Sequence, residues 1–315
     1  MTAQDSAIAP SAGPLSERAG LGWGLLGVTA FSLTIPFTRI AAHDGLSPLF
    51  IGAGRAVVAA ALAAGCLLIS RPVVPDRGQW ARLAVVAGGV VAGFPLLTSY
   101  ALTQAPAAHG AVVVGLLPAA TAAMAVLRGR ERVPAAFWLF AGLGAAAVVA
   151  FAALRTGGLG APHRADLLLF GAVLAAAVGY AEGGLLAREL GSWQTVSWAL
   201  LLAAPLMLGL TAAAVAGERP SGTAGQWLAF SYLSVVSMYL GFFAWYRGLA
   251  IGPMTRVSQV QLVQPVLGIL WATLLLREPL GGATVAGGLA VVALARGAVR
   301  VRGATRRSAE DCAAR

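Results

Sequence analysis

Polar side chains recur along one apolar stretch of the chain, where they could hydrogen-bond a small molecule. The stretch runs from Pro253 to Leu280 and is long enough to cross a membrane. Its polar and small residues are 3, 3, 4 and 3 positions apart, which places them on one face of a helix. These residues are Ser258, Gln261, Gln264, Gly268 and Trp271. Because an amide that faces lipid costs several kcal/mol, we expect this face to look at protein or water.

Two interpretations of these amides are open. In the first, the face is the wall of a substrate cavity, and its glutamines bind the substrate by hydrogen bonds. In the second, the amides hold neighbouring helices together, and each such bond is worth only about 0.6–2 kcal/mol. Two glutamines and a serine on one stripe favour the cavity.

A second copy of the stretch begins at Pro106 and reads PAAHGAVVVGLLPAATAAMAVLRGRERV. Pro253 minus Pro106 and Pro265 minus Pro118 are both 147. A proline in mid-span removes one helix hydrogen bond and kinks the helix. Pro118 and Pro265 are therefore either hinges beside a binding site or static kinks, and their pairing at one offset favours the hinge.

The matching face of the second copy is apolar. It carries Ala111, Val114, Leu117 and Thr121. The two central helices thus present one amide-rich wall and one aliphatic wall. This difference predicts an amphipathic substrate whose polar head lies toward the second copy of the repeated unit.

Two charged residues lie inside apolar runs. Glu182 occurs in AAAVGYAEGGLLA, and an acid within the membrane is a functional candidate by default. It could couple transport to a proton, form a structural ion pair with Arg55, or reach water near Arg188. Arg55 could in turn pair inside the bundle or attract an anionic group.

Aromatic residues are dense between positions 232 and 246. Trp245 and Tyr246 are expected to anchor the helix at a membrane interface, where amphipathic rings gather. Tyr239 and Phe243 lie deeper and are cavity candidates.

Thr34 is a cavity candidate in the first apolar segment. Thr38 follows one turn later, and Pro36 lies between them. Both hydroxyls could instead bond carbonyls that the proline leaves free. Glu131 and Glu278 each precede a new segment, and we interpret them as turn signals beside a helix start.

The elements that must position these residues are apolar. Of the 315 residues, 58% are hydrophobic and 11% are charged, whereas a soluble domain has about 25% charged residues. The sequence therefore predicts an all-α integral membrane protein, because a span must bond its own backbone when no water is present. Ten membrane helices are expected, at 19–40, 46–70, 79–100, 106–127, 134–154, 165–187, 193–216, 224–247, 253–276 and 281–299.

The net charge of +10 reflects 22 basic residues, all of them arginine. They cluster in turns and in the C-terminal tail, which indicates membrane topology and not nucleic-acid binding. With Arg55 and Arg256 set aside, one set of alternate loops and both chain ends hold 15 arginines, and the other loops hold 5. Both termini are therefore expected in the cytoplasm. Residues 1–18 are polar, and we expect a disordered tail and not a cleaved signal.

The offset of 147 divides the chain into two copies of one unit. The expected domains are a cytoplasmic tail at 1–18, five-helix repeats at 19–154 and 165–299, and a basic cytoplasmic tail at 300–315. Five is an odd number, so the second repeat must enter the membrane from the opposite face, an arrangement that recurs in secondary transporters. Close helix packing is indicated by glycine pairs four positions apart at 20/24, 89/93, 179/183 and 248/252.

The repeated pattern resembles the EamA unit, two of which make up proteins of the drug/metabolite transporter superfamily. The residues that carry the resemblance are YLGFFAWYRGLAIGP at 239–253 and RVSQVQLVQPVLGILWATLLLREPL at 256–280. Arg55 matches the family's second-helix arginine, and Pro265 and Glu278 match its ninth-helix motif. Leu202 stands at the position 147 after Arg55, so the arginine is not duplicated.

The resemblance implies ten helices, cytoplasmic termini and a cavity lined mainly by the first, third, fourth, sixth, eighth and ninth helices. It also implies export of metabolites, amino acids or toxic compounds through a bacterial inner membrane. The expected partners are a small-molecule substrate, the lipid bilayer and, if Glu182 couples transport, protons. No cofactor, metal or nucleic acid is expected, and both a monomer and a homodimer are compatible with the sequence.

The rival hypotheses are a membrane-embedded enzyme and a scaffold that transports nothing. An enzyme should show a His/Asp/Cys cluster at a membrane face, and the sequence places His43, His109 and His163 in or near separate loops. A scaffold would not need an amide stripe beside a mid-helix proline. The sequence therefore favours a secondary transporter that works by alternating access.

Overall fold

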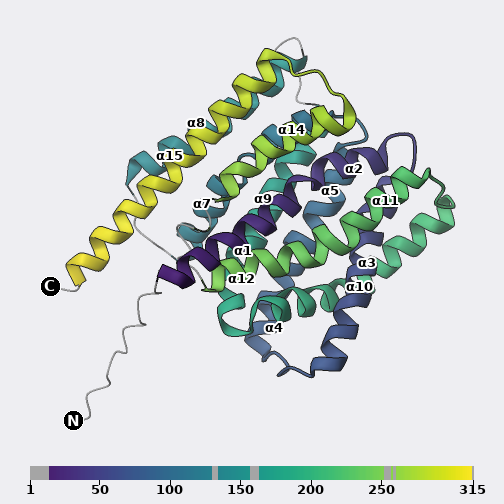
Figure 1. The fold of residues 1–315 in the computed structure, drawn as a ribbon, viewed down its shortest axis with the longest axis horizontal. Coiled ribbons are helices and arrows are strands. Elements are labelled where there is room, and N and C mark those ends of the chain that lie inside the picture. Colours follow the sequence, from purple (N-terminus) through teal and green to yellow (C-terminus); the bar gives the residue numbers. More distant parts are fainter. Residues whose placement is uncertain (1–13, 130–133, 157–162, 252–256, 258–259, 314–315) are drawn as a thin grey trace.

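The computed structural model describes the backbone of residues 14–129, 134–156, 163–251, 257 and 260–313 (Figure 1). All regular elements in this part of the chain are helical. Within the described residues, seven helices are long and apolar enough to cross a membrane. Three further apolar helices in this part of the chain are shorter. Together they correspond to the ten expected segments, so the chain is an all-α membrane protein.

Several of the ten spans are built from more than one helical element. The first repeat contains α1 (Pro14–Ser32), α2 (Thr34–Ala42), α3 (Pro48–Ser70), α4 (Arg77–Val86), η1 (Ala87–Gly93), α5 (Phe94–Ala101), α6 (Ala107–Val114), α7 (Leu117–Gly129) and α8 (Ala135–Thr156). The second repeat contains α9 (Arg164–Glu189), α10 (Ser192–Gly217), α11 (Ala224–Tyr232), η2 (Leu233–Leu240), α12 (Gly241–Ile251), η3 (Gln261–Val263), α14 (Gln264–Leu276) and α15 (Gly282–Ala313). At both chain ends the helix extends past the expected span, because α1 begins at Pro14 and α15 continues to Ala313.

The third and eighth spans begin with the same local structure. The Asp76 carboxylate accepts a hydrogen bond from the Gln79 backbone N–H at 2.8 Å, and the Gln79 side chain accepts one from the Asp76 N–H at 3.0 Å. Thr223 and Gln226 form the same reciprocal pair. Such a capping box satisfies two N–H groups that a helix start leaves free. The two boxes are 147 positions apart, so the repeat in the sequence is also a repeat in structure.

The same two spans change from α-helical to π-helical winding in their middle. The π-helices η1 and η2 end at Gly93 and Leu240, which are again 147 positions apart. π-helical segments are rare in proteins, and those that occur often lie at functional sites. It shifts the direction in which the following side chains point, so the second half of each span is turned relative to the first.

The spans of one repeat pack against spans of the other. In Figure 1, α1 lies beside α12 and α8 beside α15, and these pairs are in contact. Other pairs between the repeats include α2 with α11, α3 with α10, α6 with α14, α1 with α14, and α9 with α4, η1, α5 and α7. Exchanging the two repeats converts this set of pairs into itself. The five-helix units are therefore related by a pseudo-twofold arrangement, and the odd number of spans makes the repeat inverted.

Glycine allows the closest of these crossings. A Cβ atom on Gly248 of α12 would lie 2.7 Å from the backbone nitrogen of Gly24 in α1. A Cβ atom on Gly179 of α9 would lie 2.7 Å from a side-chain carbon of Val90 in η1. These two crossings, first span on eighth and sixth on third, are exchanged by the pseudo-twofold relation. The glycine pairs in the sequence therefore mark helix contacts inside the monomer.

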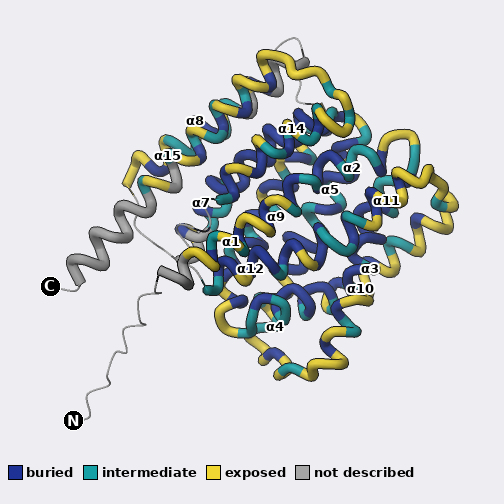
Figure 2. The backbone as a smooth tube through the Cα atoms, viewed as in Figure 1, coloured by how far each residue is buried: buried dark blue, intermediate teal, exposed yellow. Residues whose placement is uncertain are grey.

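Buried residues fill the middle of the bundle, whereas much of α8 and α15 at one edge is exposed (Figure 2). Large apolar side chains such as Leu68 and Leu228 lie on the outside, as expected where lipid is the solvent. The expectation that Trp245 and Tyr246 anchor at a membrane interface is wrong. Their exposed fractions are 2% and 0%, because α12 packs so closely on its neighbours that both rings point into the bundle.

Candidate functional site

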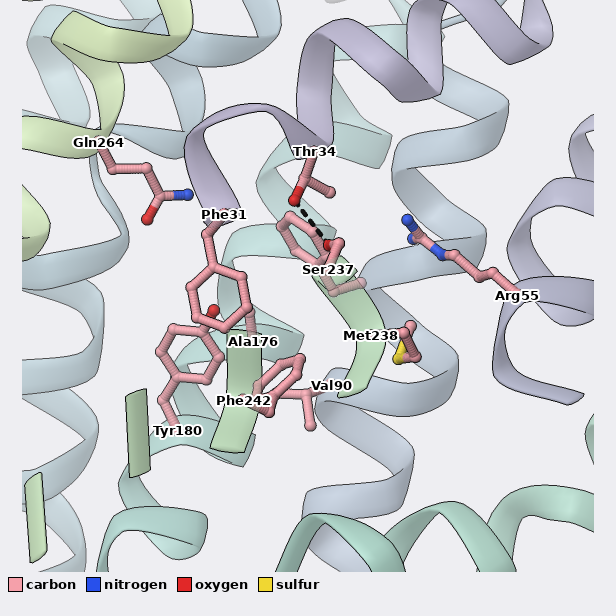
Figure 3. Close-up of a pocket in the computed structure, with 11 residues that line it drawn as sticks. Phe31, Thr34, Arg55, Val90, Ala176, Tyr180, Ser237, Met238, Phe242 and Gln264 are labelled. Carbon is pink, nitrogen blue, oxygen red and sulfur yellow. Dashed lines mark hydrogen bonds between the residues drawn. The ribbon is translucent and has the colours of Figure 1, made fainter. Parts of the chain in front are cut away.

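A small cavity lies where helices of the two repeats meet (Figure 3). Its described lining comes from the first, second, third, sixth, eighth and ninth spans. The lining residues are Phe31, Thr34, Arg55, Val90, Phe94, Ala176, Tyr180, Ser237, Met238, Phe242 and Gln264. The volume open to the centre of a water molecule is about 20 Å³, which is room for little more than one water. In this structure the cavity is nearly filled by its own side chains.

Arg55 is the charged residue of this lining. It lies on α3, only 1% of it is exposed, and its Nε and Nη2 atoms have no hydrogen-bond partner among the described residues. In Figure 3 the guanidinium extends from α3 toward Ser237 and Thr34. Gly52 and Gly54 precede Arg55 on α3. Because these glycines lack side chains, Leu96 and Phe230 approach α3 closely at these positions. The structure thus places a buried cation at the wall of the cavity.

A hydrogen bond between the repeats forms another part of the wall. The hydroxyl oxygens of Thr34 and Ser237 are 2.7 Å apart. Thr34 begins α2 after the break at Leu33, and Ser237 lies in η2. Val90, 147 positions before Ser237, lies in η1 and also lines the cavity. Both π-helices therefore turn equivalent positions toward the same space.

The carbonyl that Pro36 leaves without its helix N–H is that of Ser32, and Thr38 bonds a different one. The Thr38 hydroxyl donates a hydrogen bond of 2.7 Å to the carbonyl oxygen of Thr34, and it does not line the cavity. Of the two threonines, Thr34 is the one that reaches the site.

Aromatic rings form the apolar side of the cavity. The ring centroids of Phe31 and Phe242 are 4.9 Å apart, those of Phe31 and Tyr180 are 6.2 Å apart, and those of Tyr180 and Phe242 are 5.8 Å apart. These separations lie in the range of favourable ring pairs. The three rings come from α1, α9 and α12, so this surface also joins the two repeats.

Gln264 reaches the cavity from the ninth span. It begins α14 directly after the 3-10 turn η3, and Pro265 follows it. Its side chain is buried, and its Oε1 has no hydrogen-bond partner in the described structure. Figure 3 shows the amide pointing toward Phe31. Gln261 is also buried, with an Nε2 that lacks a described partner, but it is not part of the described lining.

The fourth and ninth spans are broken at equivalent positions. Gly115 and Leu116 separate α6 from α7, and Pro118 lies in the first turn of α7. Leu262 and Val263, 147 positions later than Gly115 and Leu116, lie in η3. Prolines 118 and 265 thus each follow a break in the α-helix. A hinge role for them stays a prediction.

The expected aliphatic wall does not appear in the described lining, which contains no residue of α6 or α7. A Cβ atom on Gly268 would lie 2.9 Å from the Cβ of Ala111. The fourth and ninth spans therefore pack directly on each other at this level, and Val114 and Leu117 are buried in the core. Trp271, expected on the same stripe as the glutamines, donates a hydrogen bond of 2.9 Å to the Ser32 hydroxyl.

Glu182 is bound to Arg82, and not to Arg55 as one of the sequence hypotheses had it. The carboxylate accepts from the Arg82 Nε, and the Nη1 of the same arginine lies 2.7 Å from a carboxylate oxygen of Glu189. Arg82 belongs to α4 and both acids belong to α9. The cluster therefore joins the start of the third span to the end of the sixth, across the repeats. Glu182 is 3% exposed, so it is not an acid that simply reaches water.

Two other contacts join the repeats at the opposite end of the bundle. The Glu278 carboxylate accepts hydrogen bonds of 2.8 Å from the backbone N–H groups of Ala107 and Ala108. His109 and Asp166 are 2.6 Å apart. Glu278 was interpreted as a turn signal, but its side chain caps α6 in the other repeat.

The remaining candidates lie away from the cavity. The hydroxyl of Tyr239 is 3.1 Å from that of Ser197, and the ring of Phe243 packs edge-on against Trp23 at 5.8 Å. Neither belongs to the described lining. Ser258 lies outside the described residues. No group of three His, Cys, Asp or Glu side chains in the described part of the chain could hold a metal ion.

Sequence reasoning missed most of the apolar lining. Phe31, Tyr180 and Phe242 were not singled out, because aromatic residues are common throughout membrane spans. Ser237 was missed as well, and the offset of 147 does not point to it, because its equivalent position, Val90, was not a candidate either. The missing information was the π-helical turn, which does not follow the 3.6-residue period of an α-helix.

Comparison with known proteins identifies a family, a curated relative and solved structures of similar fold. The EamA-like transporter family matches residues 18–153 and again residues 163–296. The uncharacterized transporter YdeK of Bacillus subtilis (strain 168) is 44% identical over 273 residues, which cover 86% of this chain and 94% of YdeK. A solved structure described as "Crystal structure of protein" has a TM-score of 0.63 at 21% identity and covers 93% of this chain and 99% of its own. The last match supports the fold alone.

Proposed function

Because this chain belongs to the EamA-like transporter family and is a membrane transporter, we propose that it exports a small amphipathic compound across the cytoplasmic membrane. The compound would be a metabolite, an amino acid or a drug-like molecule. The observation that carries the proposal is the cavity at the junction of the repeats. Its described wall combines one cation, three neutral polar side chains and four aromatic rings, a mixture that suits a molecule with a polar and an apolar end.

Alternating access is supported by the contacts at the two ends of the bundle. At one end Arg82 binds Glu182 and Glu189, and at the other Glu278 caps α6. Both sets join one repeat to the other. A rocking motion of one repeat against the other would break one set at a time and open the cavity to one side. We assign Glu182 to this closure and not to a transported proton, because its carboxylate is bound to Arg82.

The excess of arginine assigns the Arg82 end to the cytoplasm, together with both chain termini. The repeats are taken as residues 19–154 and 165–299, in a multi-pass protein of the bacterial inner membrane. In this orientation the cytoplasmic side is closed by ion pairs, and the opposite side is closed by a helix cap and the His109–Asp166 pair.

The experiment that tests export compares metabolites in the medium and in cells, with and without overproduction of the protein. Compounds enriched in the medium are then tested for movement in proteoliposomes under an imposed proton gradient. Protein-free vesicles and vesicles without a gradient are the controls. Movement that needs the protein supports the proposal. No solute movement under any gradient would contradict it and favour a scaffold.

A further inference from the structure

The cavity holds a positive charge that no described acid neutralises. Arg55 is fully buried on a membrane helix, and an intramembrane arginine is normally paired because burial of an isolated charge is very costly. The described acids of the bundle are engaged elsewhere. Glu182 and Glu189 bind Arg82, Asp166 binds His109, and Glu278 caps α6. The Nε and Nη2 atoms of Arg55 can therefore still donate to a partner that is not among the described side chains.

The polar groups around Arg55 suit an anionic partner. Thr34 and Ser237 share one hydrogen bond, which leaves the cluster further capacity to donate. Gln264 has an unpartnered amide oxygen, and a half-turn of the amide would present its NH₂ group instead. The described lining contains no carboxylate. A positive charge and neutral donors bind an anionic head, and a cationic head would meet repulsion here.

The aromatic side of the cavity defines the rest of the ligand. Phe31, Tyr180 and Phe242 form a connected apolar surface beside the polar cluster. A flat or hydrocarbon body fits such a surface, because offset and edge-on ring contacts are favourable.

We propose that the cavity binds an organic monocarboxylate, with its carboxylate on Arg55 and its apolar body against Phe31, Tyr180 and Phe242. A planar guanidinium matches a carboxylate with two parallel hydrogen bonds. The inference rests on the proposed transport function and narrows its substrate class to amphipathic anions. Because the described wall offers no acid to an ammonium group, cationic compounds are rejected and amino acids bind more weakly than the corresponding plain acids.

As it stands in the structure, the cavity has room for little more than one water. Binding must therefore select a more open state, and the ligand shifts the population toward it. A measurement on the purified protein in detergent, where both states can form, is the appropriate test.

The test uses three probes with the same body: 3-phenylpropionate, 3-phenylpropionamide and 3-phenylpropylamine. Their affinities are measured by calorimetry on the full chain. We expect 3-phenylpropionate to bind at least tenfold more tightly than the amide and the amine. Arg55→Gln should remove this preference, and Arg55→Lys should keep part of it because the charge remains. Arg77→Gln, which removes an exposed arginine outside the cavity, should bind like the unaltered protein.

Equal affinity for the acid and the amide in the unaltered protein would overturn the inference, and this comparison needs no variant to fold. Unchanged acid binding by a folded Arg55→Gln protein would overturn it as well. If none of the three probes bound, the inference would be overturned for ligands with a phenylpropyl group. The transport function is judged separately by the metabolite comparison: export of neutral or cationic compounds alone removes the anion inference and leaves export standing, whereas no export at all removes the proposed function.

Discussion

Arg82 in the first repeat binds Glu182 in the second, although the two residues are 100 positions apart. The side chain of Glu182 is 4% exposed and that of Arg82 is 25% exposed, so the pair lies at the edge of the bundle with its acid inside. Glu189 binds the same arginine from about two turns further along α9. One arginine thus binds two acids and links α4 of one repeat to α9 of the other.

Loss of Arg82 is expected to destabilise the protein more than loss of the whole pair. Arg82→Gln removes the described cation that binds the buried Glu182 carboxylate and should cost about 3–5 kcal/mol. The double variant Arg82→Gln with Glu182→Gln should recover part of this loss, because no buried charge remains. Thermal unfolding in detergent measures both, with Arg77→Gln as the control. A double variant that is less stable than Arg82→Gln alone would contradict this account.

Removal of the Glu278 carboxylate should weaken the opposite end. Glu278→Ala deletes both acceptors for the first N–H groups of α6 and should cost roughly 0.5–2 kcal/mol, as the loss of an N-cap does. Glu278→Gln should cost less, because one amide oxygen can still accept. Glu218→Ala, which removes an exposed acid after α10, is the matched control. The idea fails if the two alanine variants melt at the same temperature.

Two glycine-to-alanine changes should have opposite effects on stability. A Cβ at Gly248 would lie 2.7 Å from the backbone of Gly24, so Gly248→Ala must push α1 and α12 apart. The expected loss is about 1–3 kcal/mol, as in other overpacked sites. Gly209 in α10 has no atom within 4 Å of an added Cβ, so Gly209→Ala should gain up to about 1 kcal/mol from helix propensity. The thermal unfolding midpoints of the two variants test this prediction. Equal shifts in the two midpoints would contradict a close crossing at Gly248.

The orientation in the membrane can be tested by labelling single cysteines in intact cells. In a background with Cys66→Ser and Cys312→Ser, Gly281→Cys should react with a membrane-impermeant maleimide, and Val73→Cys should react only after the cells are opened. Both sites are exposed in the structure, so the difference reports the side of the membrane. The reverse pattern would show that the termini lie outside.

The offset of 147 carried more structural information than the spacing of the polar residues. It relates the two capping boxes, the ends of the two π-helices and the two breaks in the fourth and ninth spans. These features depend on neighbouring residues in the chain, so a repeated sequence repeats them. Burial does not follow in the same way. Leu202, at the position equivalent to Arg55, is 39% exposed, whereas Arg55 is 1% exposed.

The cavity residues show where the sequence reached its limit. Thr34, Arg55 and Gln264 were singled out because a polar group within a membrane segment needs a reason. Tyr239, Phe243 and Trp271 were singled out as well, but in the structure they meet Ser197, Trp23 and Ser32, respectively. Depth along a helix can be estimated from the sequence, but the direction of a side chain within the bundle cannot, once breaks and π-helical turns rotate the helix.

The sequence by itself determined the ten membrane helices and their arrangement in two units. Both follow from the need of a span to bond its own backbone in lipid, and from a repeat that can be counted along the chain. Only the tertiary structure decided which charges meet. In the structure Glu182 binds Arg82, and Arg55 has no described acidic partner. The sequence does not show this, because ionic contacts form between helices that are far apart in the chain. The Pro253–Leu280 stretch contributes Gln264 to the cavity, and the buried cation opposite comes from α3.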